Sequence, residues 1–166
     1  SVGTFGPSTV VAIVSTDAAT GAVLDNGTWF YYLSTSFIWH FWSGSSDSLG
    51  NSIAGQASGA WYLVAFTKAS GTQTGRYHTY RYSNTTWAHG NANQSQANGG
   101  SGGDLHIGAD WDGRIQAVAF YNKALSDAEL EAMVSTRQSW LDEEPVAMWT
   151  LNQASAATAV EDEVGS

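Results

Sequence analysis

Aromatic and amide side chains between residues 80 and 93 form the pattern in this chain that is best suited to ligand chemistry. The group comprises Tyr80, Tyr82, Trp87, His89, Asn91 and Asn93. Sugar rings stack on the faces of Trp and Tyr, while Asn and His side chains hydrogen-bond to sugar hydroxyls. The group therefore predicts a site for a glycan or another partner. The alternative interpretation is that Trp87 only plugs the end of a β-sandwich.

Four of these residues fall in the segment 83–103, which is rich in Asn, Gln, Gly and Ser and is predicted to be a long loop. A polar loop of this length in a compact domain usually has a function or is mobile. The alternative is a loop that is merely solvated. We expect the segment as a whole to contact a partner.

The distribution of carboxylates argues against a glycan hydrolase. Retaining hydrolases need two carboxyl groups about 5–5.5 Å apart, which strand alternation provides when two acids lie two residues apart. No predicted strand carries two carboxylates, because Glu129 and Glu131 lie on a predicted helix and residues 161–163 lie in a polar tail. The run 99–103 formally matches G-x-S-x-G, but it lacks the preceding strand and following helix of a nucleophile elbow. We predict a non-enzymatic protein, with a glycan-processing enzyme as a weaker alternative.

Metal ligands show no recognisable spacing. The four histidines, His40, His78, His89 and His106, are scattered, and no H-x-x-x-H pattern or carboxylate pairing links them. Asp110 and Asp112 resemble the start of a calcium loop but lack its later Glu and further oxygen ligands. We predict no cofactor and no metal, with calcium at Asp110 and Asp112 as a weak alternative.

Composition indicates one all-β domain. The chain has 166 residues, 43% of them hydrophobic and 13% aromatic, and only 13% are charged. The net charge of −9 would repel a phosphate backbone, so nucleic acid is not expected as a partner. Nine of the fifteen carboxylates lie between Asp127 and Glu163, which places the acidity in the C-terminal part. The chain has no cysteine for a disulfide, and no apolar run approaches the ~20 residues of a membrane span.

Alternating and apolar runs predict the strands that would position these residues. They lie at 10–15, at 29–33 and 37–42 as a hairpin, at 61–67, at 76–82, and at 105–109 and 114–121 around a tight Asp112-Gly113 turn. A helix is predicted over 126–141, because Ser126 and Glu129 form a capping box and apolar residues follow at helical spacing.

The segment 105–130 carries the pattern "IG…DG-x-I-x-x-V-x-x-Y-x-x-A-L-S-x-x-E-L", and Trp61 begins a "W-x-x-V-A" element. Both resemble laminin-G-like domains of the concanavalin A-like lectin/glucanase superfamily. The resemblance implies an antiparallel jelly-roll β-sandwich, here with one C-terminal α-helix. It says less about function, because this fold occurs in lectins, adhesion modules, virion proteins and glycanases.

The run "VAMWTL" at 146–151 resembles the opening strand of the same family, although it comes last in this chain. We expect residues 1–143 to form the sandwich with its helix, and residues 144–166 to supply the displaced opening strand. That strand would complete its own sandwich or a neighbour's, or begin a second repeat. We favour its own sandwich, because an unpaired apolar strand invites aggregation. The candidate subunit contacts are Val146, Met148, Trp149 and Leu151.

Two functions follow from these observations. The first is a structural or adhesion module on a surface, most simply a phage virion protein such as a capsid decoration or minor tail component. It is motivated by the missing catalytic carboxylates, the scarcity of Lys, the displaced strand and the absence of a recognisable signal peptide. The second is a lectin-like, carbohydrate-binding module of a secreted protein. The expected partners are other surface subunits, a second copy of the chain, or cell-surface glycans, at a virion surface or outside the cell and without membrane insertion.

Overall fold

The computed structural model describes residues 8–16, 22–25, 29–33, 37–42, 46–50, 58–69, 74–93, 106–108 and 111–151. The elements are β1 (Ser8–Thr16), β2 (Ala22–Asp25), β3 (Trp29–Leu33), β4 (Phe37–Trp42), β5 (Ser46–Gly50), β6 (Trp61–Lys68), β7 (Thr74–Arg81), β8 (Thr86–Asn93), β9 (His106–Ile107), β10 (Gly113–Tyr121), α1 (Asp127–Met133), α2 (Arg137–Asp142) and β11 (Ala147–Thr150). None of the helices within these ranges is long and apolar enough to cross a membrane.

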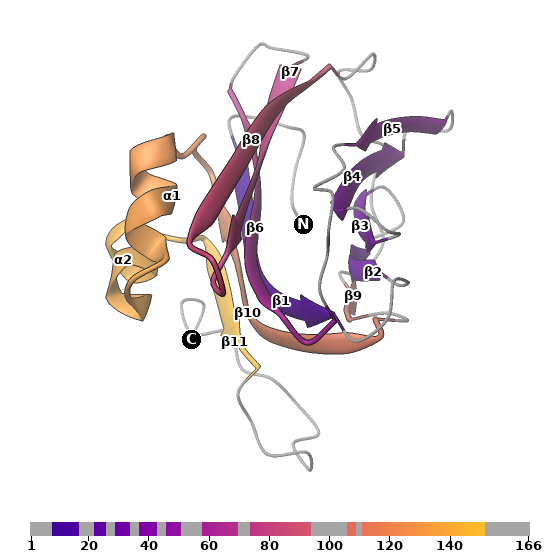
Figure 1. Cartoon of the computed structure of the whole chain (residues 1–166). Helices are drawn as coiled ribbons and strands as arrows, with labels where there is room; N and C mark the ends of the chain where they lie inside the picture. Colours follow the sequence, from indigo (N-terminus) through magenta and orange to yellow (C-terminus); the bar gives the residue numbers. More distant parts are fainter. Residues whose placement is uncertain are drawn as a thin grey trace.

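Two antiparallel sheets face each other (Figure 1). The first sheet has the order β11-β10-β1-β6-β7-β8, and the second has the order β5-β4-β3-β2-β9. Both helices lie on the face of the six-stranded sheet that points away from the second sheet (Figure 1). The predicted antiparallel β-sandwich is confirmed, and so is the hairpin of β3 and β4.

The six-stranded sheet is buried on both faces because its central strands are apolar at almost every position. In β1, Val10, Ala12 and Val14 belong to the core between the sheets, while Val11 belongs to the core beneath the helices. The same alternation divides β6, where Val64 faces the inter-sheet core and Leu63 faces the helices. Such uninterrupted hydrophobic strands are typical of sheets that are covered on both sides.

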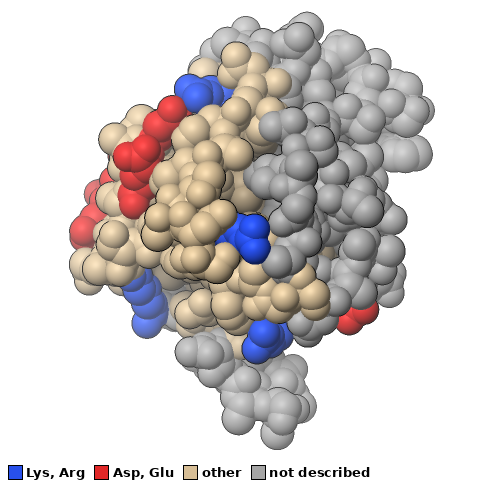
Figure 2. All heavy atoms as spheres, in the orientation of Figure 1, with Lys and Arg blue, Asp and Glu red and all other residues tan. Residues whose placement is uncertain are grey.

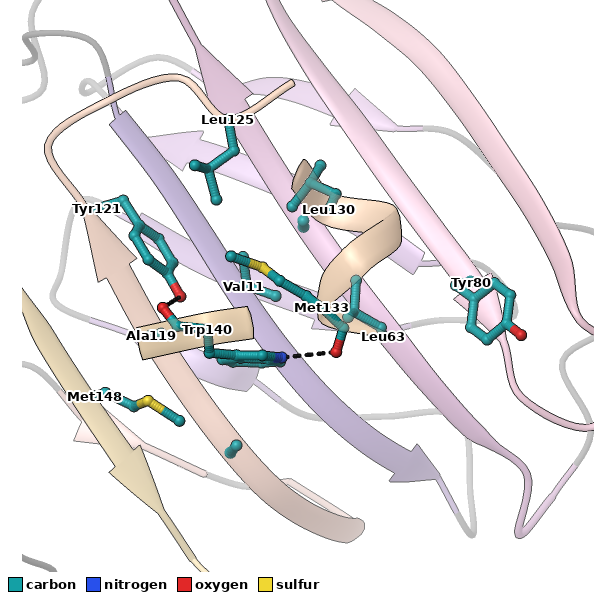
Figure 3. Close-up of a cluster of buried hydrophobic side chains, with 12 residues drawn as sticks. Val11, Leu63, Tyr80, Ala119, Tyr121, Leu125, Leu130, Met133, Trp140 and Met148 are labelled. Atoms are coloured by element: carbon teal, nitrogen blue, oxygen red, sulfur yellow. Dashed lines mark hydrogen bonds between the residues drawn. The ribbon is translucent and has the colours of Figure 1, made fainter. Parts of the chain in front are cut away.

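Trp140 is the largest buried side chain of the core beneath the helices (Figure 3). Its indole Nε1 donates to the carbonyl oxygen of Met133 at 2.9 Å, and its own carbonyl oxygen accepts from the Tyr121 hydroxyl at 3.2 Å. The first bond links α2 to the end of α1, and the second links α2 to β10. The buried indole N–H is therefore hydrogen-bonded, and no donor of this side chain is left unpaired.

The prediction of one helix over 126–141 is wrong in its middle. The capping box of Ser126 and Glu129 starts α1 as expected, but the chain leaves the helix after Met133 and restarts at Arg137. Thr136 has an extended backbone and accepts a hydrogen bond from the Ser139 backbone N–H, so it caps a second helix. Apolar spacing continued through the break, and only this local hydrogen bonding distinguishes two short helices from one.

The prediction of a loop over residues 83–103 is wrong between Thr86 and Asn93, which form strand β8, and its remainder from residue 94 lies outside the described residues. This strand pairs with β7 over its whole length, from Arg81↔Thr86 to Thr74↔Asn93. Its Asn, Gly and Ala residues have low intrinsic strand preference, and the ladder to β7 overrides that preference. The turn of residues 82–85 includes Thr85 at a φ of 52°.

The expected hairpin around Asp112-Gly113 does not form. Strand β9 pairs with β2 in the five-stranded sheet, whereas β10 pairs with β1 in the other sheet. Gly108 adopts a φ of 78°, and its carbonyl oxygen accepts from the Trp111 N–H, so the chain turns from one sheet to the other at this point. Strand periodicity shows that two segments are strands without showing which sheet each one joins.

Two further strands complete the edges. Strand β5 pairs with β4 from Ile38↔Gly50 to Trp42↔Ser46. Strand β11 pairs with β10 of its own chain, from Ala117↔Thr150 to Phe120↔Ala147. The division of the chain at residue 144 stays a prediction, because residues 152–166 lie outside the described part.

Acidic side chains gather along the helices (Figure 2). Glu131, Asp142 and Glu144 are exposed there. Lys123, which lies between β10 and α1, pairs with Glu143 and lies 3.9 Å from Glu129. Within the described residues, the helices therefore present an acidic surface.

Replacing Trp140 should test the helix-side core. Trp140→Ala should lower the free energy of unfolding by about 3–5 kcal/mol, because it leaves a large cavity and removes the bond to Met133. Tyr121→Phe removes only the hydroxyl that binds the Trp140 carbonyl and should cost about 1 kcal/mol. Urea denaturation of both variants measures the two losses. Equal losses would show that the indole is not the main support of the helices.

Candidate functional site

Strands β7 and β8 form a ladder that presents one row of polar and aromatic side chains on the helix side of the sheet. The facing pairs along this row are Arg76↔Asn91, His78↔His89 and Tyr80↔Trp87. Side chains directly opposite each other on antiparallel strands share a face and lie in contact. Because β8 is a strand rather than a loop, the predicted site residues are held in register.

The aromatic half of the row is a continuous chain of ring contacts. Tyr80 contacts Tyr82 with ring centroids 5.1 Å apart and Trp87 with centroids 5.0 Å apart. Trp87 is stacked on His89, with an interplanar angle of 11° and a centroid distance of 5.2 Å. Tyr80 is buried, whereas Tyr82, Trp87 and His89 are half-buried. The rings therefore form a supported platform that reaches solvent.

The other half of the row is built around His78, which is only 1% exposed. Its Nδ1 atom lies 2.9 Å from Nδ1 of His89 and 3.5 Å from Oδ1 of Asp127, the first residue of α1. Its Nε2 atom lies 3.1 Å from the Thr67 hydroxyl of β6. Both ring nitrogens of this buried imidazole thus have polar neighbours.

Asp127 joins the helix to this row. Its Oδ2 atom accepts a hydrogen bond from the Arg76 guanidinium at 3.2 Å, while Oδ1 faces His78. Both Arg76 and Asp127 have partly exposed side chains, so the ion pair itself contributes little to stability. Its effect is to orient the carboxylate.

Burial sets the protonation of the site. Burial, with His89 next in importance, lowers the pKa of His78 to about 4; Asp127 opposes the shift and Arg76 adds to it. His78 is therefore neutral at pH 7. Burial, assisted by Tyr80, raises the pKa of Tyr82 to about 12, so its hydroxyl stays protonated and can donate a hydrogen bond.

The row combines two chemical capacities. The platform of Trp87 and its neighbours can stack on a flat apolar face such as that of a sugar ring. His78, His89 and Asp127 each offer one ligand atom, and these three atoms lie within 4.8 Å of one another. These three residues could hold a metal ion.

A groove of about 620 Å³ lies next to the platform, and Tyr82 is part of its wall. The sheet contributes Trp61 and Gln116, and the α1–α2 segment contributes Thr136, Arg137 and Trp140. The groove thus offers aromatic faces together with hydrogen-bonding groups, which is the usual composition of a ligand site.

The remaining predicted residues are distributed more widely. Asn91 is exposed on β8, and the backbone of Asn93 pairs with Thr74.

The candidate subunit contacts differ in their burial. Met148 is buried in the helix-side core, whereas Val146 is 46% exposed. Trp149 packs edge-on against Phe120 with ring centroids 5.9 Å apart, and Leu151 is half-buried. Asp112 is exposed before β10, and Asp110 lies outside the described residues.

Sequence reasoning missed Asp127, Arg76 and Thr67 as members of the site. The spacing Trp87-x-His89-x-Asn91 has the period of a strand and could have suggested β8. No sequence signal could have identified Asp127, because it reaches the row only through the packing of α1 against the sheet.

A family model described as "Concanavalin A-like lectin/glucanases superfamily", of the laminin-G type, matches residues 4–131. No curated protein matches the sequence. Similar solved structures include the scytalido-glutamic peptidase with a peptide-based transition state analogue, at 13% identity and a TM-score of 0.34 over 72% of this chain and 78% of that one. Another is SCP-B, a member of the eqolisin family of peptidases in a complex with the tripeptide Ala-Ile-His, at 14% identity and a TM-score of 0.37 over 72% and 77%.

The buried histidine should make the metal-free protein sensitive to acid. Below the ordinary His pKa of 6.5 the unfolded chain binds a proton that folded His78 refuses until about pH 4, so stability is lost across that window as pH falls. In EDTA, the wild type should lose about 2–3 kcal/mol more than His78→Gln between about pH 7.5 and pH 4.5. Urea denaturation at both pH values measures the difference.

Val11→Ala is the control for this measurement. It removes buried apolar atoms from the core beneath the helices and changes no titratable group. Because it keeps His78, its stability relative to the wild type should be the same at both pH values. The buried neutral imidazole would be contradicted if His78→Gln lost as much stability as the wild type on acidification.

Proposed function

Because the chain belongs to the concanavalin A-like lectin/glucanase superfamily, we propose that it is a non-enzymatic, carbohydrate-binding module that acts outside the cell or on a particle surface. The platform of Tyr80, Tyr82, Trp87 and His89 carries this proposal. These rings are in mutual contact and three of them are partly exposed. Partly exposed aromatic rings, with the Asn91 amide two residues beyond His89 on the same strand, are the groups that recognise a sugar.

The neighbouring groove extends the proposed binding surface. Tyr82 belongs to both the platform and the groove wall. An oligosaccharide stacked on Trp87 would extend past Tyr82 into the groove, toward Trp61 on β6. We therefore expect an oligosaccharide to bind more tightly than a single sugar.

The distribution of acids supports a binding rather than a hydrolytic role. No strand of the described chain contains two carboxylates in its sequence. The carboxylates Asp127, Glu129 and Glu131 belong to α1. Hydrolysis through an acid pair on one strand, the geometry that alternation would provide, therefore has no source in these elements.

Replacing Trp87 tests the proposal. Trp87→Ala should weaken the binding of a glycan by about fivefold or more, because loss of one aromatic stacking contact costs about 1 kcal/mol or more. The glycan is first identified on an array, and its affinity is then measured by isothermal titration calorimetry.

Trp111→Ala is the matched control, since Trp111 packs against the inter-sheet core rather than on the platform. It should leave glycan affinity unchanged provided that the variant folds. The proposal fails if the wild type binds no glycan, or if Trp87→Ala binds as tightly as the wild type. Release of sugar from any bound polysaccharide would contradict the non-enzymatic role.

A second candidate is a structural role in a phage virion, as a capsid decoration or minor tail component that contacts its neighbours. One observation favours it. Strand β11 lies at an end of the six-stranded sheet, and Val146 beside it is a large exposed hydrophobic residue of the described chain. A strand at the end of a sheet, next to an exposed apolar side chain, is suited to pairing with another subunit.

Val146→Lys should weaken self-association if this second role is correct, because the added charge would be buried against a neighbouring subunit. Sedimentation velocity over a range of concentrations measures the association. Gln138→Lys adds the same charge on exposed α2 and should leave association unchanged. A wild type that stays monomeric throughout, or equal behaviour of the two variants, would contradict the structural role.

A further inference from the structure

We propose that His78, His89 and Asp127 bind a divalent first-row transition metal ion, with zinc as the expected occupant. The site lies on the helix side of the six-stranded sheet and joins β7, β8 and α1. His89 belongs to both this site and the platform, but the metal proposal does not rest on the carbohydrate proposal, because it uses the ring nitrogens of His78 and His89 and the Asp127 carboxylate rather than the faces of the aromatic rings.

The three ligand atoms converge from three different elements. The Nδ1 atoms of His78 and His89 are 2.9 Å apart, and Oδ1 of Asp127 is 3.5 Å from Nδ1 of His78. Two nitrogens bound tetrahedrally at about 2.0–2.1 Å would be separated by roughly 3.3–3.4 Å. The imidazoles therefore need to part by only about half an ångström to admit the ion.

The chemistry of the donors selects the class of metal. Two imidazole nitrogens and one carboxylate oxygen suit zinc and its neighbours in the first transition row. Calcium and magnesium prefer oxygen ligands alone, so they are poor occupants here. With three protein ligands, a tetrahedral ion keeps one position for water or an incoming ligand.

Each ligand is oriented by a second residue. Thr67 lies 3.1 Å from Nε2 of His78, which leaves Nδ1 of that ring to face the site. Arg76 holds the other oxygen of Asp127 at 3.2 Å. Trp87 stacks on the His89 ring and sets its plane. Metal sites in proteins use such outer partners to hold their ligands in place.

Access to the site is open on one side. His78 is buried, but His89 and Asp127 are half-buried, so an ion can enter between the β7–β8 ladder and the start of α1. A bound ion would tie the helix to the ladder more firmly than the Arg76–Asp127 ion pair does.

Titration of ZnCl₂ into tag-free, EDTA-treated full-length protein tests the site. Isothermal titration calorimetry should show one zinc per chain, and cobalt substituted for zinc should give the visible absorption of a tetrahedral ion. His89→Ala and Asp127→Asn should each weaken zinc binding by more than tenfold. Both residues are partly exposed, so the variants are expected to fold, and circular dichroism checks this.

Two further sets of variants separate a built site from adventitious binding. Thr67→Val and Arg76→Ala should weaken zinc binding about ten- to a hundredfold through loss of ligand orientation. His106→Ala removes an exposed histidine of β9 in the other sheet and should leave binding unchanged. The proposal is overturned if the wild type binds no zinc, if His89→Ala binds as the wild type does, or if His106→Ala weakens binding equally.

Discussion

The six-stranded sheet must be covered on both faces, and the rest of the structure depends on that constraint. Strands β1, β6 and β10 lie at its centre and send apolar side chains alternately to the two sides. An uncovered face would leave a large apolar surface in water, at about 25 cal/mol for each Å². The five-stranded sheet covers one face and the helices cover the other (Figure 1). Strand β10 has one extra residue, Gln116, where Ile13 and Val14 of β1 pair with Ala117 and Ile115, and Ile115 consequently packs against the inter-sheet core together with Val14.

The covering helices also decide where a site can form. Thr9 anchors the chain just before α1, since its hydroxyl donates to the Lys123 carbonyl and accepts from the Leu125 N–H, both at 2.8 Å. Leu130 and Met133 then bury the apolar side of α1 against the sheet (Figure 3). The first residue of that helix, Asp127, consequently lies over the β7–β8 ladder. The apolar core ends there, and a row of polar and aromatic side chains takes its place at the margin of the sheet.

The row of side chains on β7 and β8 gives this widely used fold a particular binding chemistry. The superfamily's sandwich supports many functions, so the specific chemistry has to come from residues placed on it. Here a buried imidazole would be costly without partners, and Thr67, His89 and Asp127 supply them. The same ladder carries the ring platform a few ångströms away, with His89 common to both through its stacking on Trp87. A ligand on the platform and an ion at the histidines would therefore act on neighbouring atoms.

The sequence by itself determined the all-β class, the family, the central strands and the start of the first helix, because these depend on local periodicity and on a capping box at Ser126. It also singled out Tyr80, Tyr82, Trp87, His89 and Asn91, although it placed the last three in a loop. Only the tertiary structure decided that β8 is a strand, that β9 and β10 belong to different sheets, and that Asp127 meets His78. The physical reason is that a ladder between strands and the docking of a helix join residues far apart in the chain. Local preference carries no information about such partners.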